Sequence, residues 1–317
     1  MSFRPELAHA TLMKYDHIFD SLEIETKPFA LCEIAGVRKV ALPADGAVTL
    51  HYVLSGEGNV IMPRRAAISI SPGSLILVPA LVQHEIRSTA TGTIPAPACQ
   101  PAELELRHVL TKGGPDEAEQ APLLALCAHI VIGLKGSGNL IDLLHDPLHM
   151  HISQQHPLFG GLKTLLGELS RPDLGSRAMV RAILLQAVIE MLRQRMAMGD
   201  GALHWMAALR DPAVWKALKA MLDAPQARHS VESLSELAGM SRSCFAKRFS
   251  QAYGSGPMEL LRDLRMRKAG RLLSETDKPV KAIAAEVGFA SRSAFSRQFE
   301  LATGQSPRSF RTALKDR

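Results

Sequence analysis

The chain has 317 residues and a net charge of +6, with 46% hydrophobic and 21% charged residues. This composition excludes fibrous and disordered proteins, and the length suggests two domains or one large domain. No stretch approaches the roughly 18 apolar residues of a membrane span, and no basic segment precedes an apolar run at the N-terminus, so we expect a cytoplasmic protein. The four cysteines, Cys32, Cys99, Cys127 and Cys244, lack zinc-ribbon spacing, and we expect free thiols.

The positive charge lies in the C-terminal third of the chain. Residues 1–205 carry 17 Lys and Arg against 20 Asp and Glu, whereas residues 206–317 carry 20 against 11, a net charge of +9. A compact basic domain beside a mildly acidic one favours a polyanionic partner. Nucleic acid is the leading candidate.

Short apolar runs separated by Gly and Pro occupy residues 30–112. They read ALCEIAG, VTLHYVLSGEGNVIM, AISISPGSLILVP and LELRHVL. Runs of strand length between turn signals are typical of a compact β-barrel or sandwich. We predict a β-rich region up to about residue 135.

Part of this region is similar to the cupin pattern. In HYVLSGEGNV and SPGSLILVPALVQH, the residues Gly73, Pro79 and His84 have the spacing of that family, but Leu81 replaces its third glycine. The upstream His-x-His pair of metal ligands is missing, and only His51 lies nearby. Because an open catalytic metal site needs about three protein ligands, we expect no metal and no cofactor. The favoured interpretation is a pocket that binds a small-molecule effector without chemistry.

Five side chains are candidates for contacting this effector. His51 and His84 belong to the cupin-like pattern. Arg38, Arg64 and Arg65 lie near predicted strand ends, where they could bind an anionic effector. The alternative for the arginines is that they are solvated loop residues.

Four further histidines, His145, His149, His151 and His156, occur in LLHDPLHMHISQQH. Their spacing suggests metal ligands, but no carboxylate completes a recognisable motif. Surface or capped histidines are therefore the favoured interpretation.

We predict that residues 140–197 are helical. Apolar residues of SRAMVRAILLQAVIEMLRQRM form a broad stripe at helical spacing, at positions 180, 183, 184, 187, 188, 191 and 192. The stripe fits either a core within the chain or the interface of a homodimer.

The C-terminal region contains a duplication. SRSCFAKRFSQAYGSGP at 241–257 and SRSAFSRQFELATGQSP at 291–307 are identical at eight of seventeen positions. A repeat of this kind indicates one supersecondary unit used twice.

Each copy is predicted to be a helix with both ends marked, by a serine N-cap and by a glycine after the last turn. Phe245 and Phe249 share the inward face of the first copy, and Phe295 and Phe299 share that of the second. A short segment ending in glycine, SLSELAG or VKAIAAEVG, precedes each copy. A short helix, a tight turn and a capped helix make a helix-turn-helix, although a helical bundle with an ordinary charged face is the alternative.

Between the copies, PMELLRDLRMRKAGRLLSE at 257–275 predicts a helix about 28 Å long. This length suits two recognition helices about one turn of B-DNA apart. The segments LAGMSRSCFAKRF, LRMRKAGRLL, IAAEVGFASRSAFSRQF and GQSPRSFR follow in an order that resembles the AraC/XylS family of bacterial transcription regulators. The resemblance implies that the two motifs enter successive major grooves of double-stranded DNA.

The same resemblance implies which residues face the bases. They are the outward residues of the two recognition helices: Ser243, Ala246 and Lys247 in the first, and Arg292, Ser293, Ser296 and Arg297 in the second. Ala246 is shorter than the polar residue often found there, so we expect recognition of the first half-site either to be weaker or to use DNA shape and thymine methyl contacts. The family also implies a homodimer, and contact with RNA polymerase if the protein is an activator.

The sequence thus predicts an α+β protein in which a cupin-like β-barrel is followed by helices and then by an all-α double helix-turn-helix domain. Residues 1–200 form the effector and dimerisation domain, β-rich to about 135 and helical over 140–197, and residues 206–317 form the DNA-binding domain. The predicted function is effector-dependent transcription regulation. The alternative is a cupin-type metal-dependent enzyme with a basic helical accessory domain, and metal content separates the two.

Overall fold

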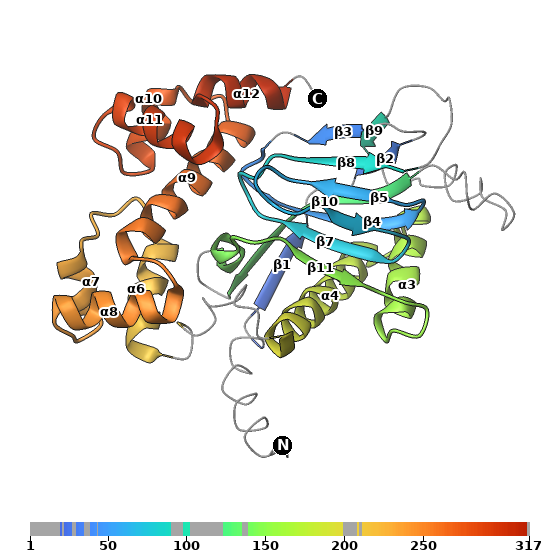
Figure 1. Cartoon of the computed structure of the whole chain (residues 1–317), viewed down its shortest axis with the longest axis horizontal. Coiled ribbons are helices and arrows are strands. Elements are labelled where there is room, and N and C mark those ends of the chain that lie inside the picture. Colours follow the sequence, from blue (N-terminus) through green and yellow to red (C-terminus); the bar gives the residue numbers. More distant parts are fainter. Residues whose placement is uncertain are drawn as a thin grey trace, which may run out of the picture. The chain divides into compact units, whose positions relative to one another are not determined.

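The computed structural model describes residues 20, 22–26, 30–34, 39–42, 44–89, 98–101, 123–134, 139–198, 208 and 211–315 (Figure 1). They fall into two compact units. The β-rich unit contains Ile24–Val131 and Asp146–Met191, and the helical unit contains Ile132–His145 and Leu192–Arg308. No helix in the described ranges is both long enough and apolar enough to cross a membrane.

Two sheets build the β-rich unit. Their strands are β1 (Leu22–Thr26), β2 (Ala30–Ile34), β3 (Lys39–Leu42), β4 (Val48–Ser55), β5 (Gly58–Ile61), β6 (Ile68–Ile70), β7 (Ser74–Val78), β8 (His84–Ser88), β9 (Ala98–Pro101), β10 (Leu123–Leu134) and β11 (Leu148–His151). One sheet has the order β11-β7-β4-β10-β2-β9, with β1 beside β10, and the other has the order β3-β8-β5-β6. Residues from both sheets, including Val53, Val60, Ile76 and Ile86, pack into one apolar core. The predicted cupin-like barrel is confirmed in this unit.

Two residues of the segment SPGSLILVPALVQH adopt left-handed backbone conformations. Gly73 has φ +93°, and a Cβ there would lie 2.4 Å from the carbonyl oxygen of Ile152. Leu81, which stands where the family has glycine, has φ 66°, and its N–H donates to the Asp45 carbonyl at 2.7 Å. A non-glycine residue in this conformation costs about 1–2 kcal/mol. The turn therefore keeps the geometry of the pattern although the glycine is lost.

Beyond the barrel, the chain continues through η3 (Leu140–Leu143), β11, α3 (Leu158–Ser170) and α4 (Ser176–Met198). The prediction that 140–197 is helical throughout was wrong at β11. Leu148 and Met150 are buried there with period two, and the strand pairs with β7. LELRHVL lies outside the described residues.

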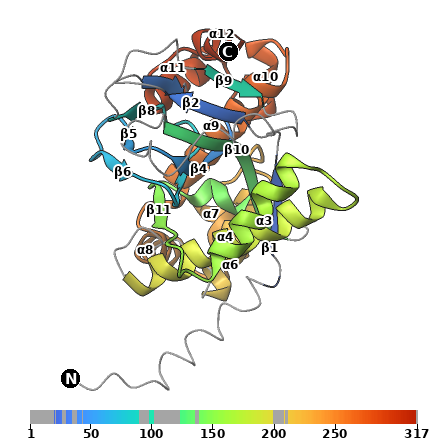
Figure 2. The ribbon, with the colours of Figure 1, turned by 90° about the vertical axis from the view of Figure 1, so that its right-hand side faces the viewer.

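The apolar stripe of α4 is covered within the chain. Helices α3 and α4 lie side by side (Figure 2), and Ile183 approaches Gly161. All seven residues of the stripe are buried, as Val180, Ile183, Leu184, Ala187, Val188, Met191 and Leu192. Of the two interpretations of the stripe, the structure supports the intrachain core.

The helical unit contains α6 (Pro212–Asp223), α7 (Val231–Leu237), α8 (Arg242–Tyr253), α9 (Pro257–Glu275), α10 (Val280–Glu286) and α11 (Arg292–Thr303), and α12 (Pro307–Lys315) begins at its end. Helix α9 spans the 19 residues predicted for the linker, beginning with Pro257 in its first turn. The α+β class and the double helix-turn-helix are thereby confirmed.

Candidate nucleic-acid interface

The two helix-turn-helix motifs are built alike. In each, a seven-residue helix, α7 or α10, precedes a twelve-residue helix, α8 or α11. The side chain of Ser241 accepts from the Cys244 N–H at 3.4 Å, and Ser291 accepts from the Ala294 N–H at 3.1 Å. Gly254 and Gly304 end the helices with φ values of 92° and 74°. The predicted caps are confirmed at both ends of both recognition helices.

Aromatic rings fix the inward face of each recognition helix. The Phe245 and Phe249 rings lie 5.6 Å apart in α8, and the Phe295 and Phe299 rings lie 5.7 Å apart in α11. All four side chains are fully buried. Because side chains at helical spacing share a face, burying these rings leaves the opposite face exposed.

The predicted base-facing residues lie on that opposite face. Ser243, Lys247, Arg292, Ser293 and Arg297 are exposed. Ala246 and Ser296 occupy the same position in the two helices and are half-buried.

Lys247 and Arg297 occupy equivalent positions of the two recognition helices. Neither forms an ion pair in the part of the chain that the structure describes. By contrast, Arg242 of α8 pairs with Glu232, and Arg248 pairs with Asp211, the N-cap of α6. Lys247 and Arg297 therefore place a cation at the same position of each exposed face, where it can contact a phosphate or a guanine.

Arg265 of α9 connects the two motifs. Its guanidinium donates from Nε to the Pro225 carbonyl at 2.8 Å and from Nη2 to the Ala227 carbonyl at 2.9 Å. The same guanidinium lies 5.9 Å from the ring centroid of Phe289, in the turn of the second motif. A Cβ on the neighbouring Gly288 would lie 2.6 Å from the Gln226 carbonyl oxygen. The loop before α7 thus packs against the turn before α11.

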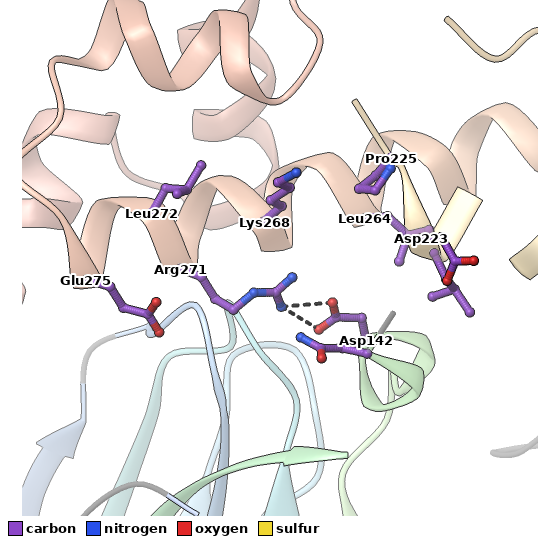
Figure 3. A pocket seen from close by; sticks show the side chains of 10 residues that line it. Asp142, Asp223, Pro225, Leu264, Lys268, Arg271, Leu272 and Glu275 are labelled. Atoms are coloured by element: carbon purple, nitrogen blue, oxygen red, sulfur yellow. Dashed lines mark hydrogen bonds and ion pairs between the residues drawn. The ribbon is translucent and has the colours of Figure 1, made fainter. Parts of the chain in front are cut away.

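A second set of polar contacts holds α9 to η3 within the helical unit. Arg271 Nη1 donates to both carboxylate oxygens of Asp142 at 2.8 Å (Figure 3). Buried Arg267 donates to the Leu144 carbonyl at 2.9 Å. The Arg267 guanidinium can only donate, so His145 accepts with Nδ1 at 3.3 Å and its Nε2–H donates to the Tyr253 hydroxyl at 2.7 Å. Nothing in the sequence patterns signalled this network.

A hollow of about 260 Å³ lies beside these contacts. Lys268 and Arg271 line it together with Asp142, Asp223 and Glu275 (Figure 3). Because charges of both signs line it and Arg271 is already paired, the hollow does not select one ligand charge.

Burial raises the pKa of the Asp263 carboxyl on α9 from its usual value of 3.8. A folded-state pKa above the unfolded value means that this group's stabilising contribution is present below about pH 4 and is lost as the pH rises through the folded pKa. Asp263→Asn should therefore raise the melting temperature at neutral pH, where the wild-type carboxylate is charged.

The gain should vanish near pH 3, where both side chains are neutral. Circular dichroism melts of the full chain at the two pH values measure this, with Glu236→Gln at an exposed carboxyl of α7 as control. An equal shift at both pH values would contradict the assignment to Asp263 ionisation.

The five candidate effector residues do not all come together in the β-rich unit. His51 and His84 are buried inside the barrel with their Nε2 atoms 2.7 Å apart. Arg64 and Arg65 are exposed, and Arg65 pairs with Asp146. Arg38 lies outside the described residues.

The residues around His51 do not fit the three-ligand metal site of metal-dependent cupins. His51 directs Nδ1 to Cys127 Sγ at 3.0 Å and Nε2 to His84, so both of its ring nitrogens are engaged with other side chains. Within the described ranges, no group of three or more His, Cys, Asp or Glu side chains has the arrangement of a metal site.

The histidines near β11 have separate environments. His149 is half-buried and His151 is exposed on β11, and His156 Nδ1 accepts from the Leu158 N–H at 3.2 Å. His145 belongs to the α9 network.

Comparison with known proteins agrees with this architecture. Residues 234–313 match the model described as a helix-turn-helix domain, and residues 16–197 match the model described as a cupin. The HTH-type transcriptional regulator AlkR of Acinetobacter baylyi is 25% identical over 299 residues, which cover 93% of this chain and 97% of AlkR. An uncharacterized HTH-type transcriptional regulator of Haemophilus influenzae is 28% identical over 292 residues, 89% of this chain and 93% of that protein.

Among solved structures, ToxT of Vibrio cholerae shares the fold. Its TM-score is 0.51, and the match covers 92% of this chain and 98% of ToxT at 12% identity. The double helix-turn-helix and the barrel define a DNA-binding transcription regulator with a cupin domain. The chain belongs to the AraC/XylS family of regulators, and the cupin match alone spans more than half of it.

Proposed function

We propose that α8 and α11 read two half-sites of one operator and that the cupin domain responds to a small-molecule effector. In this assignment, residues 1–200 form the effector and dimerisation domain and residues 206–317 the DNA-binding domain of a non-enzymatic cytoplasmic regulator. The observation that supports it most strongly is the equivalence of Lys247 and Arg297, two exposed cations at one position of a duplicated motif. Genomic footprinting with and without metabolite extracts tests both halves of the proposal.

Arg297 carries the sequence preference of the second half-site in this proposal. An arginine on that face can bind guanine O6 and N7 with two hydrogen bonds, worth about 1–3 kcal/mol of discrimination. Arg297→Ala should therefore weaken binding to the cognate site and flatten the preference at one base pair.

Lys281→Ala provides the control, since Lys281 is an exposed cation on α10 rather than on a recognition helix. It should leave the order of preferred bases intact. Competition binding over single-base operator variants at fixed salt makes the comparison. If Arg297→Ala lowers all affinities equally, Arg297 contacts phosphate instead.

If the cupin domain is a sensor, the purified full-length protein should contain no tightly bound metal, because His51 and His84 supply only two of the three ligands that a catalytic site needs. Elemental analysis of protein purified without chelator measures this. One equivalent of metal that is lost in His84→Ala would instead support the metal-dependent enzyme.

The homodimer in this proposal cannot use the apolar stripe of α4, because that stripe is buried within the chain. Its contact surface must lie elsewhere on the effector domain. RNA polymerase is a further partner if the protein activates transcription.

A further inference from the structure

A chain of four buried polar side chains crosses the interior of the barrel. Cys32 lies on β2, Cys127 on β10, His51 on β4 and His84 at the start of β8. Their exposed fractions are 0%, 6%, 0% and 3%. The proposed effector and DNA contacts use neither thiol.

The strand register brings these side chains together. His51 lies directly opposite Cys127 in the β4–β10 pair. Cys32 lies opposite Ala125 in the β2–β10 pair, two residues from Cys127, so both thiols project from the same face. The two sulfur atoms are 3.2 Å apart, and Cys32, Ala125 and Cys127 form a small buried cluster of their own.

The hydrogen bonds indicate where the protons lie. The Val82 carbonyl can only accept, so His84 donates to it from Nδ1 at 3.3 Å and presents a bare Nε2. His51 then donates from Nε2 to His84, which leaves a lone pair on His51 Nδ1. That lone pair faces Cys127 Sγ at 3.0 Å. His51 is thus placed to accept the proton of the Cys127 thiol.

We propose that Cys32 and Cys127 are an oxidisable dithiol that a hydroperoxide converts into a disulfide, with His51 as the base. A thiolate is the nucleophile in such chemistry, and a sulfenic acid condenses readily with a neighbouring thiol. Cys127 is the attacking residue because it is the more exposed of the pair, and fully buried Cys32 resolves the intermediate. The proposal concerns thiol chemistry alone and does not depend on the DNA-binding assignments.

The steps balance without a further reactant. His51 Nδ1 takes the Cys127 proton, and the thiolate attacks one peroxide oxygen, forming an S–O bond and breaking the O–O bond. The departing hydroxide recovers the proton from His51 as water. Cys32 Sγ then attacks Cys127 Sγ, forming the S–S bond and breaking the S–O bond, and the hydroxyl leaves with the Cys32 proton as a second water. One hydrogen peroxide is reduced to two waters while two thiols are oxidised.

Closing the bond shortens the distance between the sulfur atoms from 3.2 Å to about 2.05 Å. Because β2 and β10 are already paired, the two cysteine side chains must rotate toward each other beside His51. The covalent change thus takes place in the wall of the barrel itself.

Exposed Cys244 on α8 is the internal reference for the test. The reduced full-length protein is treated with one equivalent of hydrogen peroxide, alkylated in denaturant and digested for mass spectrometry. We expect Cys32 and Cys127 to lose their thiols together, a peptide linking them to appear, and Cys244 to stay alkylated. Dithiothreitol should restore both thiols.

Three variants separate the roles. Cys32→Ser should leave Cys127 as a sulfenic acid that dimedone captures, and Cys127→Ser should leave Cys32 reduced. His51→Gln keeps a polar side chain but removes the base, so thiol loss should slow while thermal melting confirms the fold. If this variant does not fold, the two serine variants still test whether Cys127 attacks the peroxide and Cys32 resolves the sulfenic acid.

Several results would overturn the proposal. One is oxidation of Cys244 before the buried pair, with Cys32 and Cys127 reacting only on unfolding. Another is a disulfide between Cys32 and Cys99, which lie opposite each other in the β2–β9 pair. A rate of Cys127 oxidation in folded His51→Gln equal to that of wild type would remove His51 from the mechanism.

Discussion

Phe249→Ala and Phe299→Ala should each destabilise the DNA-binding domain by about 3–5 kcal/mol, the usual cost of truncating a core phenylalanine. Both rings are fully buried at matching positions of the duplicated motif, and each packs against a second phenylalanine one turn earlier. Removing either ring leaves a cavity under a recognition helix. Because typical domains are stable by only about 5–15 kcal/mol, the loss should be large enough to reduce DNA binding as well.

Thermal and denaturant unfolding of the full-length variants measure this cost. The matched control is Leu301→Ala on α11, since Leu301 is a large apolar side chain that is 75% exposed. It should change stability little. Wild-type melting of Phe249→Ala or Phe299→Ala would show that these rings do not hold the recognition helices in place.

The affinity for operator DNA should fall by roughly 10³ to 10⁵ between about 50 and 200 mM salt if about six to ten phosphates are contacted. The physical reason is the release of counterions from DNA, which the net charge of +9 on residues 206–317 would drive. Titrations across this range at constant pH give the slope of log affinity against log salt. A nearly flat slope would contradict an interface dominated by phosphate contacts.

Lys247→Gln refines this measurement at the first recognition helix. If Lys247 contacts a phosphate, the variant should reduce the magnitude of the slope by about one, whereas a contact to a base should mainly alter the preferred sequence. Glu300→Gln on α11 provides a charge change on an exposed acidic side chain for comparison.

Features encoded within a few residues were predictable. The serine caps, the terminal glycines and the limits of α9 follow from local conformational preferences, and the duplication supplied two independent copies of the same signal. The outward positions of Lys247 and Arg297 follow from the buried phenylalanines, because helical geometry ties one face to the other. Their contacts with DNA stay predictions.

Features that depend on distant partners were not predictable. Leu148 and Met150 alternate over only four residues, too short a run to outweigh the surrounding helical pattern, and β7 decides their conformation. Leu81 takes a left-handed conformation because the Asp45 carbonyl and the turn hold it there. The contacts of His51 with Cys127 and His84 join residues 76 and 33 positions apart, beyond any local pattern.

The position of Arg265 at the crossing of the two motifs has a consequence for the operator. Because Pro225, Ala227 and Phe289 all contact one guanidinium, the two motifs cannot rotate relative to each other without breaking these contacts. Each base pair inserted between two half-sites turns the second by about 34–36° around the DNA axis, since B-DNA has about 10–10.5 base pairs per turn. A DNA-binding domain whose two motifs are held in one relative orientation cannot adjust to that rotation. The protein should therefore recognise the number of base pairs between the half-sites as well as their sequences.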